Sequence, residues 1–265
     1  MKNFLQAEFD EVWENLRFFV SSLKRIKNSR FFDLNEKCFC VDTGCESASE
    51  NWVYYPQKIN YDDVSKIINF FGKRDFVFPI YEPIEPIKNS EIEFLKQSGL
   101  NYAGNLLAMN FVHSKITSDF NSDFVIADNK ALLNEWAEVS LRGFEVDFEK
   151  LPEQFLNLAL SFENNKQIIP VIAKEKITHK NLGSFLIANS QIKTNLSGIY
   201  YFSVIPEFRR KGIARDMMNF AANFSHKFSN KIILQATPSG IPFYRNFGFK
   251  ELFEIKLFSC SNDVF

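Results

Sequence analysis

One stretch of this sequence constrains the fold more than any other, the run SVIPEFRRKGIARDMMNFAANF from Ser203 to Phe224. The apolar residues Gly198 to Val204 are typical of a buried strand, and Pro206 ends it because proline cannot donate a ladder hydrogen bond. A long helix is expected from Arg210 to Phe228, since apolar residues recur on one face at helical spacing: Ile213, Met217, Ala221, Phe224 and Phe228. The stretch therefore predicts a strand, a tight turn and a long helix in direct succession.

The turn between the strand and the helix carries three consecutive cations, Arg209, Arg210 and Lys211. Cations are unfavourable at a helix start, where the dipole places partial positive charge, unless an anion lies among them. The first backbone N–H groups of a helix have no partner within it and, together with the dipole, form an anion site. Gly212 has no Cβ, so a phosphate group can approach the backbone, and Ala214 is also small. The turn is interpreted either as a diphosphate site or as a solvated basic turn.

Two motifs occur together in the second half of the chain, VIPEFRRKGIA at the turn and YRNFGF after the next buried strand, KIILQAT. In order and separation they resemble the GCN5-related N-acetyltransferase (GNAT) superfamily, over about residues 124 to 258. The resemblance implies an α+β fold with a mixed, mostly antiparallel central sheet flanked by helices. It also implies an enzyme that transfers an acetyl group from acetyl-CoA to a primary amine.

The resemblance further implies which residues bind acetyl-CoA. The pantetheine arm pairs with the backbone of the strand before the turn, at Phe202, Ser203 and Val204. The diphosphate lies on the turn and the helix start, at Arg209, Arg210, Lys211, Gly212, Ile213 and Ala214. Ser239 is a further candidate contact, in place of the family's frequent asparagine. Gln235 in the next strand is interpreted either as a hydrogen-bonding contact in the cleft or as a residue that satisfies a neighbouring group.

For catalysis, the resemblance implies that a neutral amine attacks the thioester carbonyl while a backbone N–H near Val204 polarises it. Tyr244 occupies the position of the family's frequent tyrosine acid, and a phenol with a reference pKa of about 10 stays protonated at neutral pH. The alternative for Tyr244 is a buried core residue. The general base is not identified. Glu145 and Asp147 follow a predicted helix in a region that often lines the acceptor site in this family, or they are exposed loop acids.

The chain has four cysteines: Cys38, Cys40, Cys45 and Cys260. Cys38 and Cys40 are too close for the two-residue spacing of a zinc knuckle, and no histidine completes a ligand set nearby. The cysteines are predicted to be reduced and structural, and no metal site is expected.

Apolar periodicity predicts further elements in both halves of the chain. Those of the first half are helices at Phe4 to Ile26, Tyr61 to Phe71 and Glu91 to Gln97, and strands at Phe31 to Val41, Asn51 to Tyr55, Phe76 to Glu82 and Asn105 to His113. Those of the second half are strands at Phe124 to Ala127, Ile168 to Ala173, Gly183 to Asn189 and Glu251 to Phe258, and helices at Asn129 to Leu141, Glu153 to Phe162 and Ile241 to Asn246.

The order of these elements bears on domain organisation. Both halves end in strand, helix, strand, short helix, strand, which suggests two copies of one fold with a drifted first copy. Two unrelated α+β units are the alternative. The polar stretch Ser114 to Asp123 places the boundary, so that residues 1–117 form an accessory domain and residues 118–265 an acetyltransferase domain.

Composition and charge limit the kinds of molecule that the chain is expected to bind. The chain is 46% hydrophobic and 24% charged with a formal net charge of −1, so it has no overall basic field to attract nucleic acid. No secretory signal or membrane-spanning stretch is recognised, and a cytoplasmic location is predicted. The expected acceptor is a small-molecule amine or a protein or peptide amine, and a homodimer is left open. A catalytically weak CoA-binding regulatory or protein-interaction module is the alternative function, and an aminoacyl transferase that uses charged tRNA is disfavoured by the intact basic turn.

Overall fold

The structure is a computed structural model that describes residues 2–81, 87–112, 120–146, 152–190 and 196–261. The chain divides into two compact units. Unit 1 comprises Met1–Met109 together with Gln235–Phe265, and unit 2 comprises Asn110–Leu234. The boundary expected between residues 117 and 118 lies outside the described residues, and the assignment of two domains on either side of it stays a prediction.

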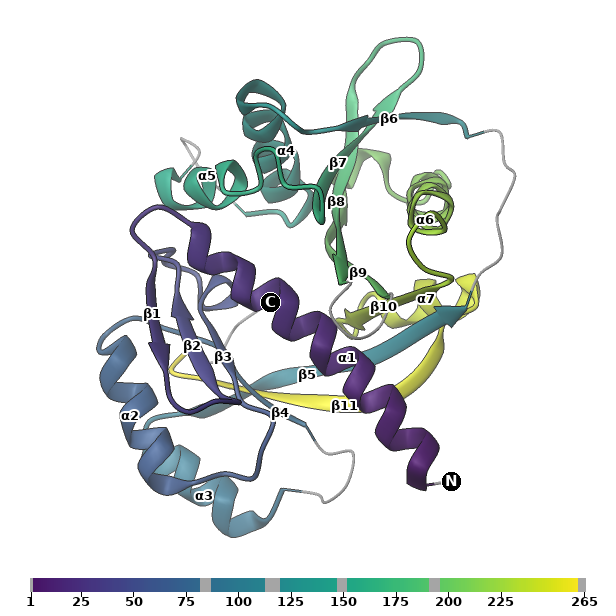
Figure 1. The fold of residues 1–265 in the computed structure, drawn as a ribbon. Helices are drawn as coiled ribbons and strands as arrows, with labels where there is room; N and C mark the ends of the chain where they lie inside the picture. The colour runs from purple at the N-terminus through teal and green to yellow at the C-terminus, as the bar shows by residue number, and fades with distance from the viewer. Residues whose placement is uncertain (1, 82–86, 113–119, 147–151, 191–195, 262–265) are drawn as a thin grey trace. The chain divides into compact units, whose positions relative to one another are not determined.

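Unit 1 combines two groups of strands with helices (Figure 1). An antiparallel sheet contains β1 (Arg30–Asp33), β2 (Phe39–Asp42) and β3 (Trp52–Tyr54) in that order. A second group contains β4 (Phe78–Tyr81), β11 (Lys250–Ser259) and β5 (Asn101–Val112), with β11 in the middle; the last three residues of β5 belong to unit 2. The helices are α1 (Lys2–Ser22), α2 (Tyr61–Phe71), α3 (Asn89–Gln97) and α7 (Ile241–Phe247), with a 3-10 turn η1 (Leu23–Arg25) after α1 and η2 (Ala48–Glu50) before β3.

One expected element of unit 1 is wrong. The stretch Phe31 to Val41, predicted as a single strand, forms an antiparallel hairpin of β1 and β2. Between these strands, Oδ1 of Asn35 accepts hydrogen bonds from the backbone N–H groups of Lys37 and Cys38, both at 2.9 Å. Asparagine stabilises turns in this way, so one polar side chain reverses the chain within an otherwise strand-like run.

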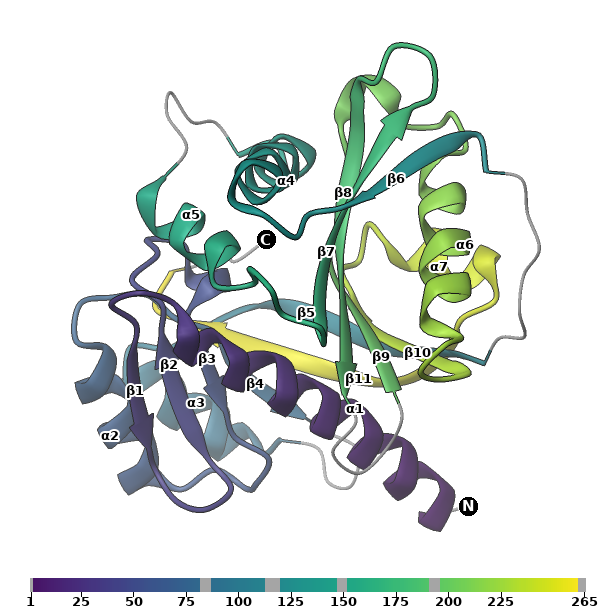
Figure 2. The same cartoon turned by 45° about the horizontal axis from the view of Figure 1, so that its top comes forward.

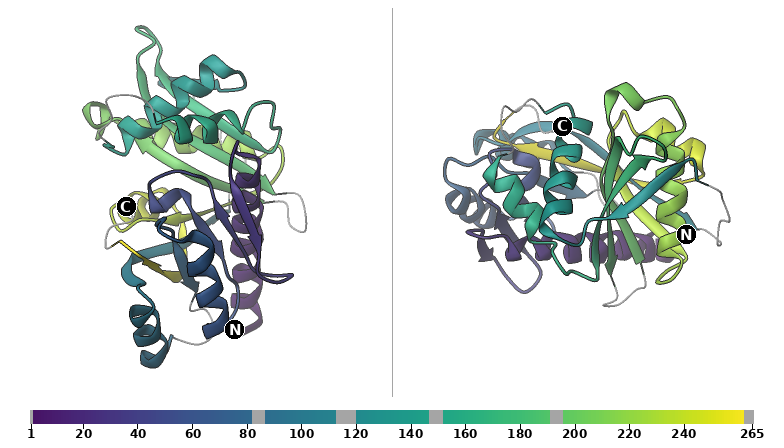
Figure 3. Two further views of the ribbon diagram at one scale, coloured as in Figure 1. Left: turned by 90° about the vertical axis from the view of Figure 1, so that its left-hand side faces the viewer. Right: turned by 90° about the horizontal axis from the view of Figure 1, so that it is seen from above.

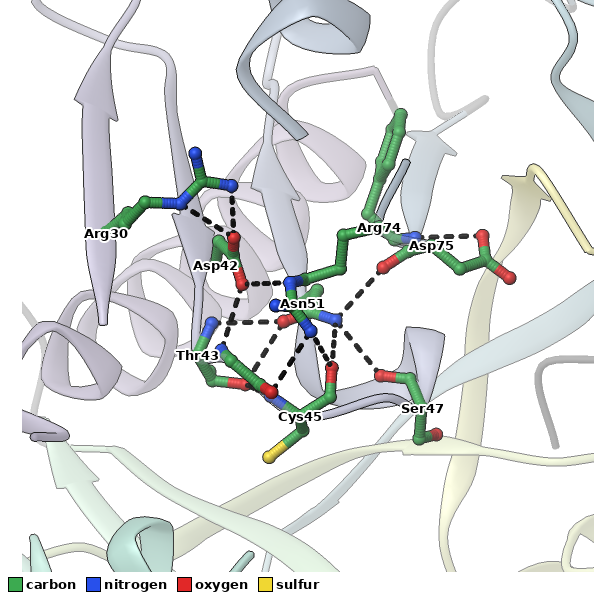
Figure 4. Close-up of polar contacts among 10 residues, drawn as sticks. Arg30, Asp42, Thr43, Cys45, Ser47, Asn51, Arg74 and Asp75 are labelled. Carbon is green, nitrogen blue, oxygen red and sulfur yellow. Dashed lines mark hydrogen bonds and ion pairs between the residues drawn. The ribbon is translucent and has the colours of Figure 1, made fainter. Parts of the chain in front are cut away.

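A buried amide holds the loop between β2 and β3 in place (Figure 4). Asn51 is 0% exposed, and its Oδ1 accepts from the backbone N–H and the hydroxyl of Thr43 at 3.0 and 3.1 Å. Its Nδ2 donates to the backbone carbonyls of Cys45, Ser47 and Asp75 at 3.0, 3.2 and 3.0 Å. Both polar atoms of this side chain are therefore engaged, as a buried polar group requires.

Beside this amide, a buried carboxylate is enclosed by two arginines (Figure 4). Asp42 is 2% exposed and accepts from Nε of Arg30 at 2.9 Å and from the backbone N–H of Gly44 at 2.9 Å. Nε of Arg74 lies 3.0 Å from Asp42, and Nη1 of Arg74 donates to the carbonyls of Gly44 and Cys45 at 3.0 and 3.2 Å. Because the buried charge is paired and hydrogen-bonded, this polar network supports the fold of unit 1.

Unit 2 is a layered arrangement of helices on a mostly antiparallel sheet (Figure 2). Its strands are β6 (Ser122–Ile126), β7 (Ile168–Glu175), β8 (Asn181–Ser190), β9 (Leu196–Val204) and β10 (Lys231–Ala236), of which the last two residues belong to unit 1. They follow the order β6-β7-β8-β9-β10. Successive pairs are antiparallel, except that β9 and β10 are parallel. The helices are α4 (Lys130–Gly143), α5 (Glu153–Leu160) and α6 (Ile213–Ser225), with a 3-10 turn η3 (Pro206–Phe208) before α6.

The helices of unit 2 cover opposite faces of β7, β8 and β9 (Figures 2 and 3). On one face α4 packs with α5, and Nε1 of Trp136 in α4 donates to the carbonyl of Phe185 in β8 at 3.0 Å. On the other face, the ring of Phe220 in α6 contacts the rings of Phe185 and Phe124, in β8 and β6. The helix predicted from Arg210 to Phe228 spans Ile213–Ser225, and Arg210 and Gly212 before it adopt left-handed backbone angles.

None of the helices formed by the described residues has the length and apolar character needed to cross a bilayer.

Candidate active site

The candidate site is built around the turn that leads from β9 into α6. Arg210 has φ 61°, and Gly212, the N-cap of α6, has φ 83°. A Cβ at Gly212 would meet no atom within 4 Å, so glycine is favoured here by the left-handed backbone and the space beside it is open. The turn therefore presents its backbone to solvent and is conformationally constrained at two positions.

The start of α6 presents N–H groups next to this open space. The first helical hydrogen bonds are donated by Arg215 and Asp216 to the carbonyl of Gly212, at 3.0 and 3.1 Å. The N–H groups of Gly212, Ile213 and Ala214 precede these donors, as the first amides of any helix do. They lie at the positive end of the helix dipole, which is the geometry of an anion site.

The cations of the turn differ in what their side chains do. Arg210 and Lys211 are exposed, and the ammonium of Lys211 lies 5.3 Å from the centre of the Phe208 ring. The guanidinium of Arg209 instead donates to protein oxygens, those of Val204, Gly143 and Glu145. The three basic residues that look equivalent in sequence are therefore not equivalent in the structure.

Strand β9 is irregular just before the turn. Its register with β8 runs from Leu186 opposite Tyr200 to Ser184 opposite Ser203, so β9 contains one more residue than β8 over this interval. Tyr201, within that bulge, has φ 50°. The parallel register with β10 covers Ser197 and Gly198, before the bulge, whereas the register with β8 continues to Val204 at the end of the strand. A bulge bends its strand and re-aims backbone groups, here over the residues predicted to pair with pantetheine.

Buried hydroxyl groups gather on the α4 face of β8 and β9. Ser203 is 6% exposed, and a Cβ at Gly143 of α4 would lie 2.2 Å from its Oγ, so the Ser203 side chain faces α4. Ser184 lies directly opposite Ser203 in the register and shares its face. Ser140 lies one helical turn before Gly143 and is also fully buried. Among the described residues, none of these three hydroxyls has a hydrogen-bond partner.

Three of the predicted residues belong to unit 1. Nε2 of Gln235 is buried and has no hydrogen-bond partner within the described ranges. The exposed Ser239 has its Oγ 3.1 Å from Oγ1 of Thr237. Tyr244 in α7 is 8% exposed and packs edge-on against Phe243 and Phe249. Burial raises the pKa of Tyr244, so its phenol is protonated at neutral pH.

Of the two loop acids considered as general bases, the structure describes only Glu145. Asp147 lies outside the described residues. Glu145 has φ 59° and its Oε2 lies 2.6 Å from Nη1 of Arg209, so this carboxylate is committed to an ion pair. Sequence reasoning missed the link between these residues, and it missed Gly143, because 64 positions separate Glu145 from Arg209 and no local pattern connects them.

The cysteines lie in unit 1 as free thiols, and Cys38, Cys40 and Cys45 are buried. Burial raises the pKa of Cys38 to about 11 and that of Cys45 to about 12, so these thiols are protonated at neutral pH. Across the described ranges, no three His, Cys, Asp or Glu side chains come together in a way that could hold a metal ion.

Comparison with known proteins agrees with this geometry. Residues 166–251 match the family model of the acetyltransferase (GNAT) domain. No curated protein matches the chain. A GCN5-related N-acetyltransferase from Kribbella flavida has a similar structure, with TM-score 0.62 and 9% identity over 96% of this chain and 94% of that one. A GCN5-related N-acetyltransferase from Sphaerobacter thermophilus has TM-score 0.55 and 13% identity, over 86% of this chain and 81% of that one.

A functionally unknown conserved protein from Staphylococcus epidermidis ATCC 12228 is also similar, with TM-score 0.60 and 14% identity over 88% of this chain and 94% of that one. At these identities the similar structures show the fold. The matched domain covers β8, the bulged β9, the basic turn and α6. GNAT acetyltransferases take their acetyl group from acetyl-CoA, which is accordingly the cosubstrate here. Residues 166–251 thus form an acetyltransferase (GNAT) domain, and the chain has the GNAT fold.

Proposed function

We propose that this protein transfers the acetyl group of acetyl-CoA to a primary amine by direct attack of the amine on the thioester. The observation that carries the proposal is the left-handed turn at Arg210 and Gly212, which opens the start of α6 to solvent. A diphosphate bound there would accept hydrogen bonds from the N–H groups of Gly212, Ile213 and Ala214. The exposed cations Arg210 and Lys211 would neutralise its charge.

The path of the pantetheine arm is proposed from the geometry of β9. The arm is an extended chain with two amides, so it can pair with a strand edge as an added strand does. Residues Phe202, Ser203 and Val204 lie beyond the part of β9 that is in register with β10. Gln235 and Ser239 are further proposed contacts, and the partnerless Nε2 of Gln235 is a donor suited to an amide carbonyl.

The chemistry follows from this placement. The nitrogen of a neutral amine forms a bond to the thioester carbon, the C–S bond breaks, and the nitrogen loses a proton to solvent water, which balances the proton gained by the departing sulfur. We propose that the Val204 N–H stabilises the negative charge that develops on the carbonyl oxygen, and that Tyr244 donates a proton to the departing sulfur. The high pKa of the Tyr244 phenol keeps that proton available at neutral pH.

The acceptor is proposed to be a small-molecule amine or an amine of a protein or peptide. A catalytically weak CoA-binding module stays the alternative, because no general base is identified among the described residues. The degenerate first copy of the fold, the cytoplasmic location and the homodimer also stay predictions.

The test is a screen of amine acceptors with acetyl-CoA in which released thiol is measured, together with the shift of the melting temperature caused by CoA. A ligand that binds the folded state raises the melting temperature, so the shift measures binding apart from turnover. Thiol release that depends on an added amine would support the enzyme. A CoA shift without amine-dependent release would favour the binding module, and the absence of both would overturn the proposal.

A further inference from the structure

Arg209 is exposed like Arg210 and Lys211, but its guanidinium donates hydrogen bonds to oxygens of the protein. Its Nε donates to the carbonyl of Val204 at 3.0 Å, and its Nη2 donates to the carbonyl of Gly143 at 2.8 Å. Its Nη1 donates to Oε2 of Glu145 at 2.6 Å. The planar fork of arginine can reach three acceptors at once, which a lysine ammonium cannot do in this geometry. The Arg209 charge is also paired with a carboxylate, so it is already balanced without an anionic ligand.

The oxygens that Arg209 contacts come from two elements that must meet at the candidate site. Val204 is the last residue of the bulged strand β9, and Gly143 is the last residue of α4. These ends are in close contact, because a Cβ at Gly143 would lie 2.7 Å from Cβ of Ser203. Glu145, just after α4, is held in a left-handed conformation with φ 59°. Non-glycine residues persist in such conformations when surrounding contacts fix them, and Arg209 supplies one of those contacts.

We infer that Arg209 is a positioning residue and does not bind the diphosphate. It holds the end of β9 against the end of α4, and it thereby fixes the Val204 backbone that the thioester carbonyl is to meet. The expected effect of Arg209 on turnover rests on the proposed function. The phosphate contacts are assigned to the α6 amides, Arg210 and Lys211. This positioning role replaces the role expected for Arg209 from the sequence.

The test compares Arg209→Lys and Arg209→Gln with Lys211→Gln. A phosphate ligand tolerates lysine, because the charge is retained, whereas the three-acceptor contact does not. We expect both Arg209 variants to keep the CoA melting shift of the wild type and to lose about 100-fold in turnover at saturating acetyl-CoA, since small displacements of a catalytic group cost about that much. We expect Lys211→Gln to show the opposite pattern, with a reduced shift and a higher KM for acetyl-CoA.

A second acetyl donor and a control variant separate a positioning role from a phosphate contact. S-acetylpantetheine lacks the diphosphate, so the defect of the Arg209 variants should persist with this donor while that of Lys211→Gln should disappear. Arg142→Gln is the matched control, because the ion pair of Arg142 with Glu207, at 3.8 Å, also joins α4 to the segment after β9 but contacts neither backbone carbonyl. It should leave turnover and the CoA shift unchanged.

The inference would be overturned if Arg209→Lys restored turnover while Arg209→Gln lost the CoA shift, because that is the pattern of a charge contact. If the Arg209 variants fail to fold, Glu145→Gln carries the test. We expect this variant to have a lower turnover and an unchanged CoA melting shift. Loss of the CoA melting shift would contradict the inference. Failure of the proposed function is distinct from this: it would appear as a wild-type protein without amine-dependent thiol release. The CoA shifts of the Arg209 and Lys211 variants would still decide which residue contacts the diphosphate.

Discussion

Two sets of buried polar groups, one in each unit, differ in how their hydrogen bonds are satisfied. In unit 1, the buried Asn51 engages both polar atoms, and the buried Asp42 is paired with Arg30 and Arg74. In unit 2, the hydroxyls of Ser140, Ser184 and Ser203 are buried at the α4 face of β8 and β9 with no hydrogen-bond partner among the described residues. A buried polar atom without a partner costs free energy, so the first arrangement stabilises its unit and the second does not.

Three residues with a left-handed backbone also lie in this part of unit 2. Tyr201, Arg210 and Glu145 are non-glycine residues with positive φ, and they lie in the β9 bulge, in the basic turn and just after α4. Such conformations cost about 1–3 kcal/mol each and gather at functional sites, where the surrounding structure fixes them. Strain and partnerless hydroxyls therefore mark the region where acetyl-CoA is proposed to bind, whereas the satisfied network of unit 1 marks a structural core.

The largest effect should come from breaking the satisfied network. Asn51→Ala removes hydrogen bonds to Thr43, Cys45, Ser47 and Asp75 and leaves several buried groups without partners. We expect the free energy of unfolding to fall by about 3 kcal/mol or more, measured by urea titration. The folded fraction should bind CoA normally. A loss below about 0.5 kcal/mol would show that the network does not stabilise unit 1.

The next effect should come from the left-handed turn. Gly212→Val places a β-branched residue at φ 83°, and we expect CoA affinity to fall by about 100-fold, since roughly 3 kcal/mol of strain would oppose the bound conformation. Titration calorimetry with CoA measures this. Gly99→Val is the matched control, because Gly99 in unit 1 has φ 87° and equally open surroundings. Equal losses of CoA affinity in both variants would contradict the assignment of the site to unit 2.

A third effect concerns the proposed acid in unit 1. Tyr244→Phe should lower turnover by about 100-fold, the lower range for a general acid, and should leave the CoA melting shift unchanged. Tyr55→Phe is the control, because the Tyr55 hydroxyl donates to the carbonyl of Lys58 and its loss should reduce stability without changing turnover per folded molecule. Unchanged turnover in Tyr244→Phe would reduce Tyr244 to a core residue.

The smallest effect should come from the partnerless hydroxyls. Ser140→Ala, Ser184→Ala and Ser203→Ala remove atoms that contribute no hydrogen bond, so each should change the free energy of unfolding by less than about 0.5 kcal/mol or increase it. Ser259→Ala is the matched control, because the buried Ser259 hydroxyl donates to Asp75 at 2.6 Å and its loss should cost about 1–2 kcal/mol. Equal destabilisation in all four variants would erase the contrast between the units.

Local patterns predict much of this fold and only part of the site. Strand β9, the turn and the amphipathic α6 follow from apolar spacing, Pro206 and Gly212, and the structure confirms their succession. The start of α6 was predicted three residues early, because left-handed angles at Arg210 and Gly212 are not evident from composition. The orientation of Arg209 depends on carbonyls that only the folded chain brings near. The sequence therefore shows that residue 209 is a cation, but it does not show the partners of Arg209.

The most direct test of the central claim is a crystal structure of the protein with CoA. The account predicts the diphosphate on the N–H groups of Gly212, Ile213 and Ala214, with Lys211 beside it and Arg209 still bonded to Val204, Gly143 and Glu145. A diphosphate held elsewhere, with the start of α6 bare, would contradict it.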